Sequence, residues 1–168
     1  FKNGVLYIRP KNPTSYEQNL QNSWLKIDFN KKEESLTLYL LFDGILNQDM
    51  LNVLNKYKIK LPFLQKKGLI DTNLKLTVNL RTIKVNANGN FYTKKANFDY
   101  LGLNLDIFDT NISLNNYDID ISKMLVKYKQ TATANVKVKY NAKLAKGYID
   151  FNLTKVSFNH ISLHQPDR

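Results

Sequence analysis

The sequence predicts a mainly β protein: an elongated, curved antiparallel meander sheet with an apolar, groove-like concave face and one short α-helix. Apolar and polar residues alternate over long stretches, as in 74–80 and 132–140. Because successive side chains of a strand point to opposite faces, this period of two makes a sheet with one apolar and one polar face. The connections between these stretches are short, which favours antiparallel neighbours. Only residues 47–56 have a helical period instead.

The first third of the chain is expected to hold three strands and a loop. Residues 4–8 have the composition of a short strand, and residues 10–22 are rich in Asn, Pro and Gln, which is typical of a loop. The stretches 24–29 and 36–42 are expected to form a hairpin around residues 30–34.

The predicted helix over 47–56 places four apolar side chains at helical spacings: Met50, Leu51, Val53 and Leu54. Asn47 is a candidate N-cap, and Pro62 disfavours helix in the residue before it. We expect this amphipathic helix to plug or line one end of the sheet.

After Gly68 the chain is expected to be a meander of strands, with Gly89, Gly102, Gly147 and the pair Asn115-Asn116 marking turns. The whole chain, 1–168, is then one β-rich unit, made of strands and a helix in 1–60 and of the meander in 68–159. The expected strands of the meander span about 69–80, 82–92, 95–100, 103–109, 111–115, 117–121, 124–129, 131–141, 147–153 and 155–159.

The apolar residues of this alternation are the candidate functional residues, because an apolar sheet face must be covered by protein or used for a ligand. The expected apolar face consists of Leu74, Leu76, Val78, Leu80, Ile83, Val85, Phe91, Phe98, Leu103, Leu105, Ile107, Ile112, Leu114, Ile119, Ile121, Val126, Tyr128, Val136, Val138, Ile149, Phe151 and Leu153. The expected solvent face includes Lys75, Lys84, Asn86, Asn88, Asp106, Lys137, Lys139 and Asp150.

Composition narrows the classes of partner. The chain of 168 residues is 43% hydrophobic, so it can bury a core, and its net charge of +11 comes from 22 Lys against 3 Arg. Specific recognition of bases or phosphates favours Arg, whereas a Lys-rich surface suits solvation or an anionic membrane surface. The absence of Cys excludes disulfides and thiol chemistry. Because the chain begins at Phe1 with a strand-like stretch and has no apolar run long enough to span a membrane, we expect it to be a segment of a longer protein.

Catalytic and metal-binding patterns are weak. There is no glycine-rich phosphate loop and no nucleophile elbow. Asp118 and Asp120 would lie roughly 7 Å apart on one strand face, a spacing that glycosidases use, but a solvated strand face is the favoured interpretation. His160 and His164 would share a strand face without an acidic neighbour, and this pattern does not favour a metal site. We therefore expect no enzyme activity, no metal and no cofactor.

A Lys stripe is the remaining polar pattern. Lys127, Lys129, Lys137 and Lys139 have Tyr128 and Tyr140 among them, which is a combination that binds single-stranded nucleic acid when both residue types share a face. Here the Tyr residues fall on the apolar register and the Lys residues on the polar one. A solvated Lys face is therefore favoured, and no specific nucleic acid partner is expected.

Three stretches of the chain resemble the AsmA-like superfamily of bacterial envelope lipid-transport proteins, of the YhdP/TamB type. They are the helix around 50–56 leading into Leu61-Pro62-Phe63-Leu64, the strands 68–80 and 83–91, and the later strand 147–153. The resemblance covers about residues 36–158, and its motifs consist mainly of alternation and glycines.

The resemblance implies a location and a function. Members are anchored in the inner membrane of diderm bacteria and cross the periplasm, and their curved sheets carry an apolar groove along which phospholipid acyl chains are thought to move to the outer membrane. This chain would then be a segment of such a protein, partnered by acyl chains, by neighbouring segments of the same full-length chain and by anionic membrane surfaces.

Other interpretations of the same alternation remain open. One is a closed β-barrel or sandwich that binds a single small apolar ligand, and another is a self-packed structural or adhesive envelope module. A transmembrane barrel fits less well, because several strands look too short to span a bilayer.

Overall fold

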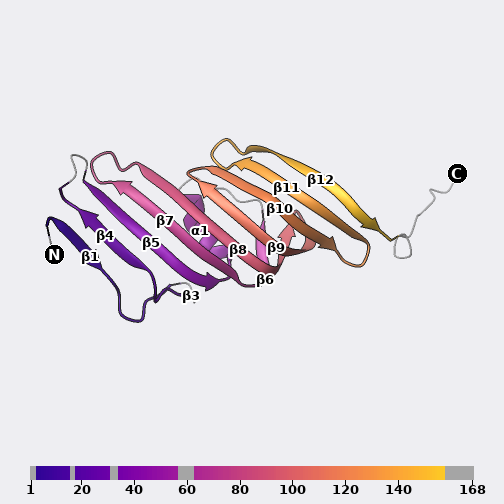
Figure 1. The fold of residues 1–168 in the computed structure, drawn as a ribbon, viewed down its shortest axis with the longest axis horizontal. Coiled ribbons are helices and arrows are strands. Elements are labelled where there is room, and N and C mark those ends of the chain that lie inside the picture. Colours follow the sequence, from indigo (N-terminus) through magenta and orange to yellow (C-terminus); the bar gives the residue numbers. More distant parts are fainter. Residues whose placement is uncertain (1–2, 16–17, 31–33, 57–62, 158–168) are drawn as a thin grey trace.

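The structure is a computed structural model, and it describes residues 3–15, 18–30, 34–56 and 63–157. One sheet dominates it, with a single short helix behind (Figure 1). The elements are β1 (Val5–Ile8), β2 (Thr14–Ser15), β3 (Gln18–Asn19), β4 (Trp24–Asp28), β5 (Ser35–Gly44), α1 (Gln48–Lys56), β6 (Leu64–Gly68), β7 (Ile70–Asn79), β8 (Val85–Tyr100), β9 (Leu103–Asn115), β10 (Asp118–Tyr128), β11 (Ala132–Asn141) and β12 (Lys146–Val156).

The sheet is an open antiparallel meander. Its strand order is β1-β4-β5-β7-β8-β9-β10-β11-β12, and β6 pairs with β8 beside this path. Short turns join the neighbouring strands from β7 to β12, whereas β2 and β3 lie between β1 and β4 in the sequence, and α1 and β6 lie between β5 and β7. Strands β1 and β12 lie at opposite edges of the sheet (Figure 1). The predicted mainly β meander with one short helix is confirmed. The alternative of a closed barrel is wrong, because β1 and β12 are the two edge strands of the described sheet and do not pair with each other.

Several expected strands are longer than the sequence indicated. Stretches predicted as separate strands form single strands in β8, β9, β10 and β12. The sequence alternation slips by one residue at these points, and the structure absorbs the slip within the strand. Asp109 in β9 has a positive φ of 43°, and the β10–β11 register shifts between Ile121 and Met124. Such irregularities bend a strand and increase its twist without ending it.

Two further corrections concern short elements. The predicted loop 10–22 contains the two-residue strands β2 and β3, which pair with each other. Strand β6 was not predicted, because Leu64-Gln65-Lys66-Lys67-Gly68 shows no alternation. It forms because the long β8 extends beyond the end of β7 and offers a free stretch of backbone. On this stretch Leu64 pairs with Asp99, and Gly68 pairs with Ala96.

Only one of the three predicted turn glycines lies in a turn. Gly102 follows Leu101 at the β8–β9 turn, and both have positive φ. Gly89 and Gly147 lie inside β8 and β12 instead. A Cβ at Gly147 would lie 2.2 Å from the carbonyl oxygen of Lys139 on β11, so this glycine permits the close approach of the two strands.

The helix begins as predicted. The side-chain oxygen of Asn47 accepts a hydrogen bond from the Met50 amide at 3.0 Å, which is the geometry of an N-cap. Figure 1 shows α1 behind β7 and β8, in the middle of the sheet, so the expectation that it lies at one end is not met. Met50 and Leu51 are half-buried, whereas the side chains of Val53 and Leu54 lie outside the described part.

Candidate functional site

The candidate site is one face of the sheet, here called the apolar face. Residues directly opposite each other on neighbouring strands have side chains on the same side of the sheet. Leu74 on β7 lies opposite Gly89 on β8, which lies opposite Leu114 on β9, and Leu114 lies opposite Ile119 on β10. The row continues to Tyr140 on β11 and ends at Gly147 on the edge strand β12. The apolar face therefore crosses the sheet without a change of side.

All but two of the predicted apolar residues lie on this face. The exceptions are Leu80 and Ile83, which belong to the connection between β7 and β8. Ile83 has a positive φ of 54° and is 68% exposed, so it does not belong to the sheet. The structure places on the apolar face Leu74, Leu76, Val78, Val85, Phe91, Phe98, Leu103, Leu105, Ile107, Ile112, Leu114, Ile119, Ile121, Val126, Tyr128, Val136, Val138, Ile149, Phe151 and Leu153.

The apolar face also extends beyond the predicted set, towards β1. Leu38 on β5 lies opposite Leu76 on β7 and opposite Leu25 on β4, which in turn faces Ile8 on β1. The signal for these residues was present in the sequence, because Leu36, Leu38 and Leu40 alternate with Thr37 and Tyr39.

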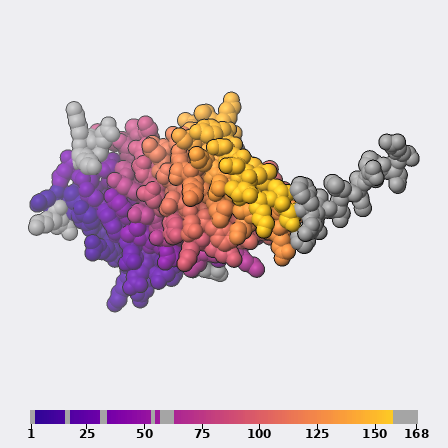
Figure 2. Space-filling view, turned by 45° about the vertical axis from the view of Figure 1, so that its right-hand side comes forward, coloured from indigo at the N-terminus to yellow at the C-terminus, as the bar shows by residue number. Residues whose placement is uncertain are grey.

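Exposure changes sharply along the apolar face. In the middle strands it is buried, in two clusters that share Phe91, Met124 and Val138 at their boundary. At the C-terminal edge every residue of β12 is exposed, and this strand lies open on the surface (Figure 2). The apolar residues of β12 on this face are Ile149, Phe151, Leu153 and Val156, with exposed fractions of 57%, 56%, 51% and 40%.

A row of threonines lies between the two clusters, next to the irregularity in the pairing of β8 with β9. Thr93 lies opposite Thr110, and both are buried, as is Thr72. Each hydroxyl donates to a backbone carbonyl: Thr93 to Leu69, Thr72 to Ile70 and Thr110 to Phe108. Because these carbonyls accept hydroxyl protons, the polar groups on the apolar face are satisfied, as burial requires.

The crossover from β5 to α1 covers part of the buried cluster. Leu46 in this crossover packs against the cluster that contains Phe98 and Ile107, as does Phe63 just before β6. A buried glutamine holds this crossover: the Leu46 amide donates to Gln65 Oε1 at 2.6 Å, and Gln65 Nε2 donates to the carbonyl of Gly68 at 2.9 Å. The crossover is thus attached to β6 by side-chain hydrogen bonds rather than by strand pairing.

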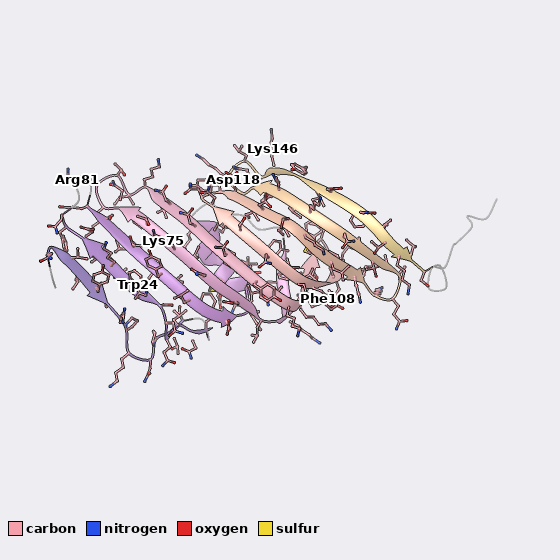
Figure 3. All side chains as sticks on the ribbon, viewed as in Figure 1. Trp24, Lys75, Arg81, Phe108, Asp118 and Lys146 are labelled. Atoms are coloured by element: carbon pink, nitrogen blue, oxygen red, sulfur yellow. The ribbon has the colours of Figure 1, made fainter. Side chains whose placement is uncertain are left out.

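The opposite face, here called the polar face, carries the residues predicted to face solvent. Lys75 lies opposite Asn88, and Lys137 lies opposite Asp150. Asp106 accepts a hydrogen bond from Asn97 at 2.8 Å, and Lys139 pairs with Asp120 at 3.6 Å. Figure 3 labels Trp24, Lys75, Phe108 and Asp118 on this side of the sheet. Asn86 shares the face and Lys84 is exposed just before β8.

The two aspartates of β10 each have a partner on β11. Asp118 accepts a hydrogen bond from Asn141 Nδ2 at 2.7 Å, and Asp120 forms the ion pair with Lys139. Both carboxylates therefore take part in cross-strand pairs on the polar face. Within the described ranges no group of acidic and His residues is arranged to hold a metal ion, and His160 and His164 lie outside those ranges.

An aromatic ladder on the polar face was not predicted. The rings of Trp24 and Tyr39 stack across β4 and β5, with centroids 3.9 Å apart, and Tyr7 lies 5.8 Å from Trp24. The ammonium groups of Lys75 and Lys26 lie over Tyr39 and Tyr7. Each of the three rings thus lies against another ring, and two of them also lie under a lysine, so the ladder stabilises the N-terminal edge of the sheet.

The Lys stripe is divided as the alternation indicated. Lys137 and Lys139 lie on the polar face of β11, whereas Tyr140 packs against the buried cluster on the apolar face. Lys127 lies over the ring of Phe108. Lys129 is the exception to the division: it lies in the β10–β11 turn with a positive φ of 51°, and its ammonium group lies over the ring of Tyr128. Lys137 and Lys139 lie on the face opposite to Tyr140.

No protein-family model, curated protein or solved structure matches the chain. Among the described residues, no helix is long and apolar enough to cross a membrane.

Proposed function

We propose that this chain is a segment of an AsmA-like envelope protein, and that its apolar face binds the acyl chains of phospholipids and passes them along the periplasm between the inner and outer membranes. The observation that carries the proposal is that one apolar face continues from a buried centre to an edge strand that nothing in the described structure covers. The proposal assigns no catalytic step, cofactor or metal to the chain.

The physical requirement for such a carrier is simple. Transfer of an acyl chain from an apolar environment into water costs about 0.8 kcal/mol per CH₂, or roughly 12 kcal/mol for a chain of about 16 carbons. A carrier lowers this cost by offering continuous apolar surface. Alternating Leu, Ile, Val and Phe side chains on adjacent strands supply such a surface, and the satisfied threonine hydroxyls add no unpaired polar group to it.

The exposed part of the face fits an acyl chain better than a polar ligand. Ile149, Phe151 and Leu153 are each more than half exposed and lie in line along β12. Exposure of three large apolar side chains on one strand is typical of a surface that binds another apolar molecule. The apolar residues of β12 are the place where we expect lipid to make its first contact.

A self-packed envelope module is the second candidate, and a specific observation favours it. Leu74, Leu114 and Ile121 are each only 7% exposed. On this interpretation the centre of the apolar face is an ordinary core, and β12 is covered by protein rather than by lipid.

Organic extraction of the purified, folded chain followed by mass spectrometry separates the two candidates. The lipid-carrier proposal predicts co-purified phospholipids or fatty acids of mixed head group, because the apolar face offers no fixed site for a head group. A chain that is folded by circular dichroism but yields no acyl lipid, and that does not take up added fatty acid, would support the self-packed module.

A further inference from the structure

The two edges of the sheet differ in how well they are protected against pairing. Exposed edge strands act as templates for further strands unless they are short or carry Pro, Lys or bulges. At one edge, β1 has four residues and is followed by Arg9 and Pro10. At the other, β12 has eleven residues, all of them exposed and none of them Pro. The edge at β12 is therefore the open one.

The middle of β12 has little charge to prevent pairing. Its two lysines, Lys146 and Lys155, lie at or near its ends, and its single bulge lies near Thr154, where the register with β11 shifts. The only charged residue between them is Asp150, which lies opposite Lys137 on β11. Among the described residues, β11 is the only strand that pairs with β12.

We propose that β12 is a self-association strand, which pairs antiparallel with β12 of a second copy of the chain around a two-fold axis at Phe151. The sequence Ile149-Asp150-Phe151-Asn152-Leu153 is symmetric in character about its centre. In this register Phe151 faces Phe151 of the second copy, Ile149 faces Leu153, and Asp150 faces Asn152. Every apolar side chain then meets an apolar one on the same face, and each carboxylate meets a neutral amide.

The register with its axis one residue earlier is less favourable. A shift of the axis by one residue, to Asp150, places two carboxylates directly opposite each other, and like charges at facing positions destabilise a strand pair. The proposed pairing also limits the size of the assembly. A two-fold contact uses the same surface on both copies, so two copies form a closed dimer and not a filament.

The dimer would join the apolar faces of both copies into one surface, because a two-fold axis perpendicular to the sheet keeps both faces on the same side. The inference rests on the edge and the sequence of β12, and it holds whether or not the apolar face carries lipid. Because each copy has a net charge of +11, association is expected to strengthen as salt is raised from low concentration.

Single-cysteine variants test the register directly, since the natural chain contains no Cys. Facing residues of an antiparallel pair have Cα atoms about 4.5–5.5 Å apart, inside the range for a disulfide. Phe151→Cys is therefore expected to form a disulfide dimer under mild oxidation. Ile149→Cys would lie about 13 Å from its counterpart and is expected to stay monomeric, as is Asn152→Cys. Equal cross-linking of all three variants, or cross-linking at residue 152 alone, would overturn the register.

Sedimentation of the delipidated chain tests the association itself. The wild-type chain is expected to dimerise reversibly. Phe151→Lys is expected to weaken the dimer about tenfold or more, because it removes an aromatic pair and places like charges opposite each other. Ile8→Lys is the matched control, because Ile8 is an exposed apolar residue on the opposite edge strand, β1. A wild-type chain that stays monomeric over the whole accessible concentration range would overturn the proposal, and fatty-acid uptake by that monomer would leave the carrier function intact.

Discussion

Val136 on β11 lies directly opposite Phe151 on β12, yet Val136 is 6% exposed and Phe151 is 56% exposed. The two side chains share the apolar face and are separated by one strand spacing. Their chemistry is alike, so the boundary between core and surface is set by where the sheet ends. The contribution of the buried part of the apolar face to stability can therefore be compared with that of the exposed part on β12.

Equal charge at these two positions should have very different effects on stability. Val136→Asp buries an unpaired carboxylate and is expected to lower the free energy of unfolding by several kcal/mol, about 3 or more. Phe151→Asp leaves its charge in water and is expected to cost less than about 1 kcal/mol. Urea denaturation followed by circular dichroism measures both. Similar losses at the two positions would show that β12 is covered in solution.

A polar barrier in the half-buried part of the face should stop lipid uptake without unfolding the chain. Leu105 and Val138 are half-buried and pack against the buried clusters. Leu105→Asp and Val138→Asp are expected to give folded proteins that no longer take up a fluorescent fatty acid. Asn135→Asp is the control, because it adds the same charge on the polar face of β11.

The outcome of these two variants separates the interpretations of the apolar face. If both variants unfold while Asn135→Asp stays folded, this part of the face is a sealed core, and the self-packed module gains support. If both fold and bind fatty acid as the wild type does, acyl chains bind elsewhere. In the carrier account, the same changes in a full-length protein are expected to weaken the outer membrane of cells.

The aromatic ladder is expected to stabilise the N-terminal edge. Tyr39→Ala removes the ring that contacts both Trp24 and Lys75, and we expect a loss of about 2–4 kcal/mol because Tyr39 is half-buried. Tyr148→Ala on the exposed β12 is the control and is expected to cost less than about 1 kcal/mol. A double-mutant cycle between Trp24 and Tyr39 should give a coupling energy of about 0.5–1.5 kcal/mol. A coupling near zero would show that the stack forms no stable contact.

The N-cap of α1 gives a smaller, local prediction. Asn47→Ala removes the acceptor of the Met50 amide and is expected to lower stability by about 1 kcal/mol. Asn55→Ala, at an exposed position of the same helix, is expected to be neutral or slightly stabilising because Ala is the better helix former. Thermal denaturation of the pair measures the difference, and equal melting temperatures would contradict a role for the cap.

Much of the fold was predictable because its cause is local. The alternation around Leu74, Leu76 and Val78 fixes which residues share a face, and the register pairs place them as the period of two requires. The N-cap at Asn47 and the turn at Gly102 also depend on a few adjacent residues.

The features that the sequence did not predict depend on distant partners. The strand β6 exists because β8 is long enough to pair with it, and the irregularity at Asp109 continues a strand where the pattern indicated an end. Gly89 sits inside β8, where a Cβ would lie 3.1 Å from side-chain atoms of Leu74 and Phe91. The stack of Trp24 on Tyr39 needs the β4–β5 register, which alternation alone does not give.

The most direct test of lipid binding is the dependence of affinity on acyl chain length. Fatty acids of about 10 to about 16 carbons would displace a fluorescent fatty acid from the delipidated chain. A continuous apolar face predicts that the apparent Kd falls about fourfold with each added CH₂, the equivalent of about 0.8 kcal/mol, until the apolar surface is filled. An apparent Kd that does not change with chain length, or no displacement by any fatty acid, would contradict the proposal that this face binds acyl chains.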